Sequence, residues 1–273
     1  MIVPDQFRTA WLSGMPRSGT TWLSQILASS PDVRLKSCPL FSYEFKNKLD
    51  KESSSEQWHQ LFRDAYTTNS EFLDQEHLRK KGLIPEFGNK KEQPEQLVIK
   101  SNRFHNLVPY ILENHEGIRF IYLVRHPCAT IYSWLTDPNE FPKSADPKAH
   151  WRTGECRKTG PGEFWGFDDW IKVTKQALEL SRIHPNRFRI FRYEDLVDNT
   201  NEVVTQIFNF LELSMTLSSE SFICSSQSRH DEHKHSVFKN PLLINKWKES
   251  LDEDIISTCL RELEGTELEQ FIL

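Results

Sequence analysis

The segment Gly14–Trp22, GMPRSGTTW, has the clearest chemical pattern in this chain of 273 residues. The spacing typical of phosphate-binding loops, G-x-x-x-x-G-K-[ST], is kept by Gly14, Gly19, Thr20 and Thr21. Thr20 stands where nucleoside triphosphate hydrolases have the lysine that reaches the terminal phosphates. The loop is therefore predicted to bind an anion without carrying out ordinary ATP chemistry.

The residues on either side of this loop predict a strand before it and a helix after it. Residues 9–13 are short and apolar enough for a buried strand, and residues 20–29 have helical spacing with one apolar face. The first N–H groups of a helix lack partners and lie at the positive end of its dipole, which stabilises a bound anion. Arg17 adds guanidinium donors that suit phosphate or sulfate oxygens. A tight turn with a solvated Arg17 is the alternative.

A second anion site is predicted where the apolar segment 119–124 runs into Arg125, His126 and Pro127. Proline suits the first turn of a helix, because its missing N–H would have no partner there. Arg125 is thereby placed at the carboxyl end of a strand and beside a helix N-terminus. A magnesium-dependent nucleotide hydrolase would have an acidic residue at this strand end. A solvated arginine on a turn is the alternative.

Short apolar segments alternate with helical patterns along the rest of the chain. Strands are predicted at residues 9–13, 97–100, 119–124 and 187–192. Helices are predicted at about 20–29, 106–115, 127–135, 168–184, 200–211 and 251–263. This alternation predicts an α/β fold, a three-layer doubly wound parallel sheet that binds ligands at the carboxyl ends of its strands. The arginines of segment 187–192 predict an edge strand.

The length favours one domain, 1–273, interrupted by two stretches of different composition. Residues 46–96 are polar and charged with a few aromatic residues, which predicts an inserted helical layer. Residues 136–167 are rich in proline, glycine, lysine and aromatic residues. A loop of that length in a compact domain is usually functional or disordered. We interpret it as a lid over a ligand site, with disorder as the alternative.

Composition narrows the partners and the location. The net charge of −5 gives no general attraction to nucleic acid. The five cysteines are odd in number and lack C-x-x-C spacing, which predicts reduced thiols rather than disulfides or a zinc site. No apolar stretch approaches the roughly 20 residues of a membrane helix, and the first residues do not resemble a signal peptide. We expect a soluble cytoplasmic protein, unless a native anchor lies outside this sequence.

Three segments together resemble the sulfotransferases that use 3′-phosphoadenosine 5′-phosphosulfate (PAPS). Pro16–Trp22 is similar to their 5′-phosphosulfate loop, Tyr122–Pro127 with Ser133 to their 3′-phosphate motif, and Arg192–Leu196 to their downstream tyrosine segment. The resemblance implies a P-loop enzyme that transfers a sulfuryl group from PAPS to a hydroxyl or amine. It implies a small-molecule or glycan acceptor, release of 3′-phosphoadenosine 5′-phosphate (PAP), and no metal.

The resemblance also implies roles for individual residues. The residues that would bind the 5′-phosphate and the sulfuryl group are Arg17, Ser18, Gly19, Thr20 and Thr21. Trp22 would stack near the adenine and Tyr193 would contact the same region, although a core aromatic is an equal alternative for Tyr193. Arg125 and Ser133 would hold the 3′-phosphate.

A C-terminal segment, 236–247, resembles the stretch with which many sulfotransferases close over the nucleotide. It offers Lys239 and Lys246 as phosphate ligands, with solvated surface lysines as the alternative. The histidines just before it, His230, His233 and His235, lack a recognised ligand spacing. No metal site is expected there.

The general base is not evident from the sequence. Small-molecule sulfotransferases have a Lys-Thr-His segment after the second strand, but Lys100–Asn102 ends in asparagine, which cannot take a proton. Tyrosyl-protein sulfotransferases use a glutamate after the first helix, where gapless matching gives Cys38 and Glu44 follows slightly later. We prefer Glu44 and then His105 as the base, and an ordinary loop residue is the alternative for each. Lys100 is expected to stabilise the leaving or accepting oxygen.

Two other functions stay open on the sequence. A nucleoside or nucleotide kinase is possible because Tyr193-Glu194-Asp195 resembles an acidic strand end. A non-catalytic nucleotide-binding protein is possible because Asn102 replaces the base.

Overall fold

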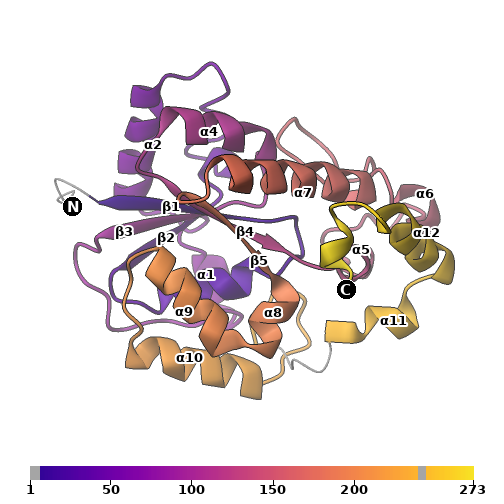
Figure 1. The fold of residues 1–273 in the computed structure, drawn as a ribbon. Coiled ribbons are helices and arrows are strands. Elements are labelled where there is room, and N and C mark those ends of the chain that lie inside the picture. The colour runs from indigo at the N-terminus through magenta and orange to yellow at the C-terminus, as the bar shows by residue number, and fades with distance from the viewer. Residues whose placement is uncertain (1–6, 239–243) are drawn as a thin grey trace.

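The computed structural model describes residues 7–238 and 244–273. In these ranges one sheet of parallel strands runs in the order β2-β3-β1-β4-β5 (Figure 1). The strands are β1 (Arg8–Ser13), β2 (Val33–Ser37), β3 (Gln96–Lys100), β4 (Arg119–Val124) and β5 (Phe188–Arg192). The predicted α/β fold is confirmed, and β5 is an edge strand as its arginines predicted.

Helices cover both faces of the sheet (Figure 1). On one face lie α2 (Ser55–Thr67), α4 (Val108–Asn114) and α7 (Gly166–Ile183). On the other face lie α1 (Thr20–Ala28), α8 (Tyr193–Asp198), α9 (Thr200–Phe210) and α10 (Leu217–Ser228). The remaining α-helices are α3 (Glu76–Arg79), α5 (Pro127–Leu135), α6 (Pro147–His150), α11 (Trp247–Ser250) and α12 (Glu253–Leu263). The 3-10 helices are η1 (Pro39–Phe41), η2 (His105–Leu107) and η4 (Glu269–Phe271).

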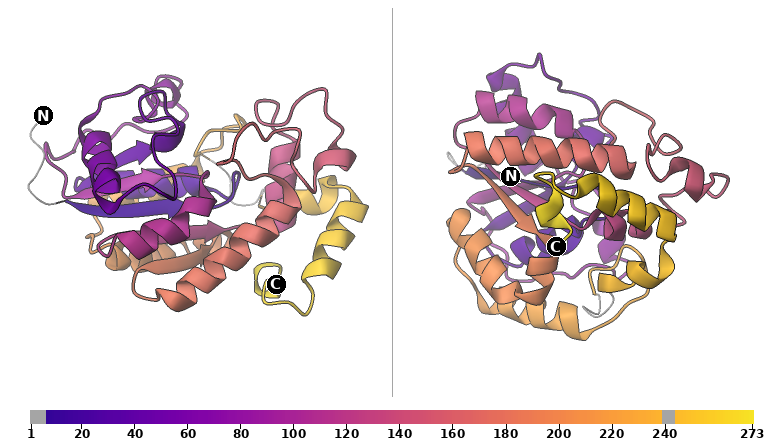
Figure 2. Two further views of the ribbon diagram at one scale, coloured as in Figure 1. Left: turned by 90° about the horizontal axis from the view of Figure 1, so that it is seen from above. Right: turned by 45° about the vertical axis from the view of Figure 1, so that its right-hand side comes forward.

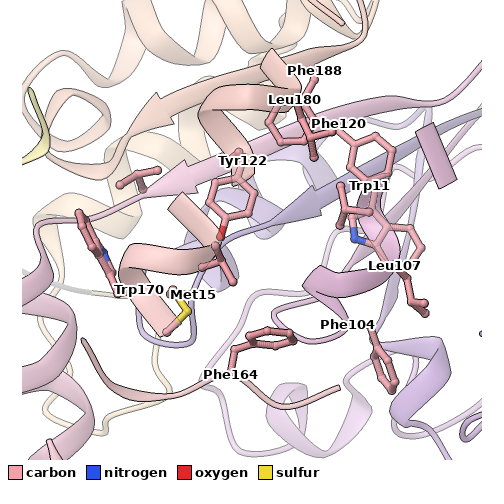
Figure 3. Close-up of a cluster of buried hydrophobic side chains, with 14 of the residues drawn as sticks. Trp11, Met15, Phe104, Leu107, Phe120, Tyr122, Phe164, Trp170, Leu180 and Phe188 are labelled. Atoms are coloured by element: carbon pink, nitrogen blue, oxygen red, sulfur yellow. The ribbon is translucent and has the colours of Figure 1, made fainter. Parts of the chain in front are cut away.

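Alternate residues of the central strands pack against the two helical layers, as the side-chain period of a strand requires. Trp11, Phe120 and Phe188 face the layer of α2, α4 and α7 (Figure 3). The centroid of the Phe120 ring lies 6.1 Å from that of Trp11 and 5.8 Å from that of Phe188. Ala10 and Leu12 face the layer of α1, α9 and α10. The sheet is therefore a rigid platform with both faces buried.

Strand β2 is absent from the sequence-based assignment, and its charged residues explain why. Lys36 lies within the strand but is only 2 % exposed. Its ammonium group donates to the carboxylate of Asp74 at 2.7 Å and to the carbonyl of Thr68 at 2.6 Å. A buried lysine needs such partners, and they come from a distant part of the chain. Helix α10 was also missed, because its serine-rich sequence has little helical periodicity.

Both stretches that interrupt the sequence pattern contain local structure. Residues 46–96 hold α2 and α3, and residues 136–167 hold α6. Phe141 and Trp165 from the second stretch pack on Trp134 of α5 in a small separate cluster. Aromatic side chains thus fasten this stretch to the domain.

The C-terminal part of the chain lies beside the helix that follows β4. Helices α11 and α12 pack against α5 at one end of the sheet (Figure 2). No helix within the described ranges has the length and apolar character needed to cross a bilayer.

Candidate active site

The carboxyl ends of the central strands meet where a cavity of about 700 Å³ opens. Strand β1 leads to β2 on one side and β4 leads to β5 on the other, so the crevice between β1 and β4 is the topological switch point. Ligands of doubly wound sheets bind at such a crevice. The predicted site residues that line the cavity are Arg17, Gly19, Thr20, Thr21, Trp22, Lys100, Arg125, Ser133, Tyr193 and Lys246.

The segment Gly14–Trp22, called the phosphate loop below, needs its glycines because neighbouring groups approach it closely. Gly19 has φ +87° and caps α1, and a Cβ there would lie 2.3 Å from the ring of Tyr193. A Cβ on Gly14 would lie 2.4 Å from the carbonyl oxygen of Leu123. Ser18 is buried in the loop, and its hydroxyl has no hydrogen-bond partner among the described residues. The loop is thus pressed against β4 and α8 with a polar group unsatisfied.

Arg17 connects the phosphate loop to helix α5. Its Nε donates to Ser133 Oγ at 3.2 Å, and its other nitrogens contact the carbonyl of Lys234 at 3.0 Å and the carboxylate of Asp137 at 3.1 Å. Burial lowers the pKa of Arg17, and the buried Asp137 carboxylate opposes that shift. The two anion sites predicted from the sequence are therefore adjacent, because one guanidinium spans them.

Arg125 packs against the phosphate loop from the end of β4. It donates to the carbonyl of Arg17 at 3.0 Å and lies 4.7 Å from the ring centre of Tyr193. Its Nε is buried, and no described residue accepts a hydrogen bond from it. Trp22 contacts Tyr193 edge-on, with ring centroids 6.4 Å apart. An arginine with an unused donor thus lies beside two aromatic rings, which suits a phosphate next to a planar base.

The residues after Arg125 are held by two partly buried contacts. The carboxylate of Glu194 accepts the backbone N–H of His126 at 3.0 Å, and burial raises the Glu194 pKa. The His126 ring stacks on Trp247 with centroids 4.3 Å apart, and burial lowers its pKa to about 3. Glu194 does not line the cavity. Its carboxylate therefore supports a backbone turn, in contrast to the metal-binding acid that a kinase would have there.

Lys100 is the last residue of β3 and Asn102 lies two residues later, and both line the cavity. Lys100 pairs in register with Leu12 of β1, and burial lowers the pKa of its ammonium group. Asn102 Oδ1 accepts a hydrogen bond from Thr20 Oγ1 at 2.8 Å. The asparagine that replaces the expected histidine therefore positions a loop threonine.

The preferred base, Glu44, does not line the cavity. Its side chain is exposed, and a hydrogen bond from Ser70 lowers its pKa. The chain turns after β2, where Cys38 has φ +46°, and Cys38 and Phe41 line the cavity from this turn. The structure therefore gives no support to Glu44 as the base.

His105, the second candidate, is also outside the cavity. Its side chain is 1 % exposed and packs edge-on against Tyr122 and Phe164, at centroid distances of 5.8 and 5.1 Å. Figure 3 shows both of these rings in the core. Burial lowers the His105 pKa to about 4. This histidine is a neutral core residue, so the structure corrects its expected placement.

The burial of His105 predicts a pH-dependent stability. An unfolded histidine binds a proton below about pH 6.5, whereas folded His105 does so only below about 4. Between these values the unfolded state binds more protons, so stability falls as the pH falls. From pH 7 to pH 5 the wild-type protein should lose about 2 kcal/mol more than His105→Gln. Urea unfolding at both pH values measures this, with His150→Gln as the control, and equal losses would contradict it.

Two lysines of the C-terminal segment were predicted as phosphate ligands. Lys246 is exposed at the rim of the cavity, and Lys239 lies outside the described residues. His235 contacts Asp137, with 3.5 Å between Nε2 and Oδ2. Within the described ranges no three acidic, histidine or cysteine residues are arranged to hold a metal ion.

Several cavity residues carried no recognisable signal in the sequence. They are Phe41, Phe72, Arg103 and Glu140. Most belong to loops with neither a motif nor a periodic pattern. Their position depends on how these loops fold over the ends of the strands.

Comparison with solved structures shows the same fold in several sulfotransferases. Mouse sulfotransferase SULT7A1 complexed with PAP has a TM-score of 0.59 at 15% identity, covering 99% of this chain and 89% of that one. A retinol dehydratase in complex with retinol and PAP has a TM-score of 0.53 at 16% identity, covering 97% and 84%. The sulfotransferase domain of the curacin biosynthetic pathway has a TM-score of 0.51 at 20% identity, covering 94% and 97%.

Sequence comparison assigns the family. No curated protein sequence matches the chain significantly. The sequence model described as "Sulfotransferase family" matches residues 11–216, which include the phosphate loop, Arg125, Ser133 and Tyr193. The chain belongs to the sulfotransferase family.

Proposed function

We propose that this protein transfers a sulfuryl group from PAPS to a hydroxyl or amine of a small-molecule or glycan acceptor and releases PAP. The observation that carries the proposal is the arrangement of the phosphate loop and Arg125 on one cavity, linked through Arg17. Two similar folds, the mouse sulfotransferase and the retinol dehydratase, were solved with PAP. A sulfuryl donor with phosphates at both ends of its ribose fits two adjacent anion sites.

The residues present fit such a donor. Arg125 lines the cavity and its buried Nε lacks a partner among the described residues, so it can bond to a phosphate oxygen. The N-terminus of α1 adds backbone N–H groups and a favourable dipole. We assign the 5′-phosphate and sulfuryl group to the loop from Arg17 to Thr21, and the 3′-phosphate to Arg125 and Ser133. Trp22 and Tyr193 would hold the adenine.

Bound PAPS supplies the sulfuryl group and a good leaving phosphate. The protein stabilises negative charge that builds on oxygens during transfer, as preorganised donors do in other group transfers. Lys100 and Thr20 line the cavity next to the loop, and Asn102 fixes the Thr20 hydroxyl. A sulfuryl group carries less charge than a terminal phosphate, so the missing loop lysine is consistent with this chemistry.

The acceptor side of the cavity is partly aromatic. Phe41 and Phe72 lie 6.1 Å apart between ring centroids and line the cavity together with Trp165. Trp165 comes from the stretch 136–167, which supports a role for that stretch as a lid. These rings favour an acceptor with an apolar or planar group.

The five cysteines are free, which supports a cytoplasmic location.

Transfer of labelled sulfate from PAPS tests the proposal. The acceptor panel contains 2-naphthol, 4-nitrophenol, a primary alcohol and glucosamine, and ATP with magnesium replaces PAPS in a parallel arm. We expect PAPS-dependent labelling of at least one acceptor and no turnover of ATP. Turnover of ATP alone would favour a kinase, and PAP binding without any transfer would favour a non-catalytic protein.

A further inference from the structure

The proposed reaction requires a base near the acceptor, and the structure offers one that the sequence motifs do not indicate. Among the described residues, the carboxylates that line the cavity belong to Glu140 and Glu232. Glu232 is exposed, whereas the Glu140 side chain is 24% exposed and held by neighbours. We infer that Glu140 is the general base that removes the proton from the acceptor. This inference rests on the proposed function.

A turn after α5 holds Glu140 close to the phosphate loop. The backbone carbonyl of Asp137 accepts the N–H groups of Glu140 at 3.1 Å and of Phe141 at 2.8 Å. The Asp137 carboxylate is buried and pairs with Arg17 at 3.1 Å. Asp137 therefore fixes the turn at one end to the loop, three residues before Glu140. The backbone carbonyl of Glu140 accepts a further hydrogen bond from Trp134 Nε1 at 3.4 Å.

The carboxylate of Glu140 is oriented but not saturated. Arg157 donates twice to the same oxygen, Oε2, at 3.0 and 3.3 Å. No described residue donates a hydrogen bond to Oε1 of Glu140. Glu163, the other acid in this network, contacts Arg103 and Arg157 but does not line the cavity. One oxygen of Glu140 is thus available to an acceptor, which is the geometry a positioned base requires.

Glu140 also lies within electrostatic range of the groups around the transferred sulfuryl group. Its charge raises the pKa values of Lys100 and Arg17, against the larger effect of burial on each. It acts in the same direction on Arg103 and His235. A single carboxylate therefore interacts with cationic groups of the phosphate loop, of β3 and of the C-terminal segment.

The chemical step assigned to Glu140 is a proton transfer coupled to substitution at sulfur. The acceptor O–H gives its proton to Oε1 of Glu140, and the acceptor oxygen forms a bond to sulfur. The bond between sulfur and the bridging phosphate oxygen breaks, and PAP leaves with the electron pair. Glu140 then returns the proton to water. No oxidant, reductant or metal is needed for this balance.

Replacing Glu140 by glutamine separates this role from charge balance. Glutamine keeps the size of the Glu140 side chain and loses its basic oxygen. Glu163→Gln is the matched control, because it removes a charge next to the same arginine, Arg157, but outside the cavity. Steady-state sulfate transfer from PAPS is measured from pH 5 to 9 with 2-naphthol and with 4-nitrophenol. PAP binding by calorimetry checks that each variant is folded.

With 2-naphthol, Glu140→Gln should lose on the order of 100-fold in kcat. With 4-nitrophenol above about pH 8, where the phenol is already ionised, the loss should be several-fold smaller, because no base is needed. PAP affinity should stay within about three-fold of wild type. Glu163→Gln should keep a kcat close to that of wild type with both phenols.

The outcomes distinguish this inference from the proposed function. An equal loss with both phenols, or a Glu140→Gln variant as active as wild type, would overturn the role as base. The same loss with 2-naphthol but not with ionised 4-nitrophenol in Cys38→Ser, with Glu140→Gln unaffected, would assign the base to that thiol instead. Wild-type protein that transfers sulfate to no acceptor would overturn the proposed function, and this inference with it.

Discussion

Replacing Arg125 by alanine is expected to weaken PAP binding by about 100-fold, which corresponds to about 2.7 kcal/mol. Arg125 has a buried Nε without a partner among the described residues, and it packs on Tyr193 next to the loop. Charge-assisted hydrogen bonds to a phosphate are worth about 1.5–3 kcal/mol each, and alanine removes at least one. Isothermal titration of PAP measures the change.

Comparison with 5′-AMP makes this test specific for the 3′-phosphate. Arg125→Ala should bind 5′-AMP nearly as well as wild type does, because that nucleotide lacks the group assigned to Arg125. The control is Arg189→Ala on β5, an exposed arginine that packs on Phe210 at 4.8 Å and does not line the cavity. If Arg125→Ala binds PAP with wild-type affinity, the assignment of the 3′-phosphate site is wrong.

Replacing Lys100 by methionine is expected to lower kcat by about 100-fold, because a preorganised cation is lost where charge develops during transfer. Methionine has a similar length and suits a buried position, so the fold should tolerate it. Lys100 is only 9% exposed and lines the cavity at the end of β3. Rates at saturating PAPS and acceptor measure this effect.

The Lys100 prediction separates a role in transfer from a role in binding. The KM for PAPS should change much less than kcat, because PAPS does not yet carry the charge that develops during the reaction. Lys175→Met, on the exposed side of α7, is the control for loss of one positive charge. A variant that raises the KM for PAPS and keeps kcat would show that Lys100 binds the nucleotide without assisting the transfer.

Local sequence predicted the parts of the site that depend on one short segment. The loop Gly14–Trp22 could be recognised because its glycines and hydroxyls act through spacing within a few residues. Arg125 could be placed because a strand pattern ends directly before it, and a proline starts the next helix. The order of most strands and helices also follows from short-range periodicity, and it led to the correct fold class.

Strand β2 shows where local reasoning ends. Its buried lysine, Lys36, forms an ion pair with Asp74, which lies in a loop nearly forty positions later in the sequence. Periodicity counts such a lysine as exposed, because it cannot include a partner that arrives only on folding. His105 was expected near the chemistry because it lies three residues after Asn102, whereas the rings of Tyr122 and Phe164 enclose it.

The site is assembled from separate segments of the sequence only when the chain folds. Hydrogen bonds join Thr20 to Asn102 and Arg17 to Ser133 across 82 and 116 positions of sequence. The carboxyl ends of parallel strands lie at one edge of the sheet, so groups from β1, β3 and β4 meet there whatever their separation in sequence. Spacing identifies an anion-binding loop, but only this convergence decides which carboxylate shares the cavity with it. Glu140 follows no motif, and a turn anchored through Asp137 and Arg17 brings it there.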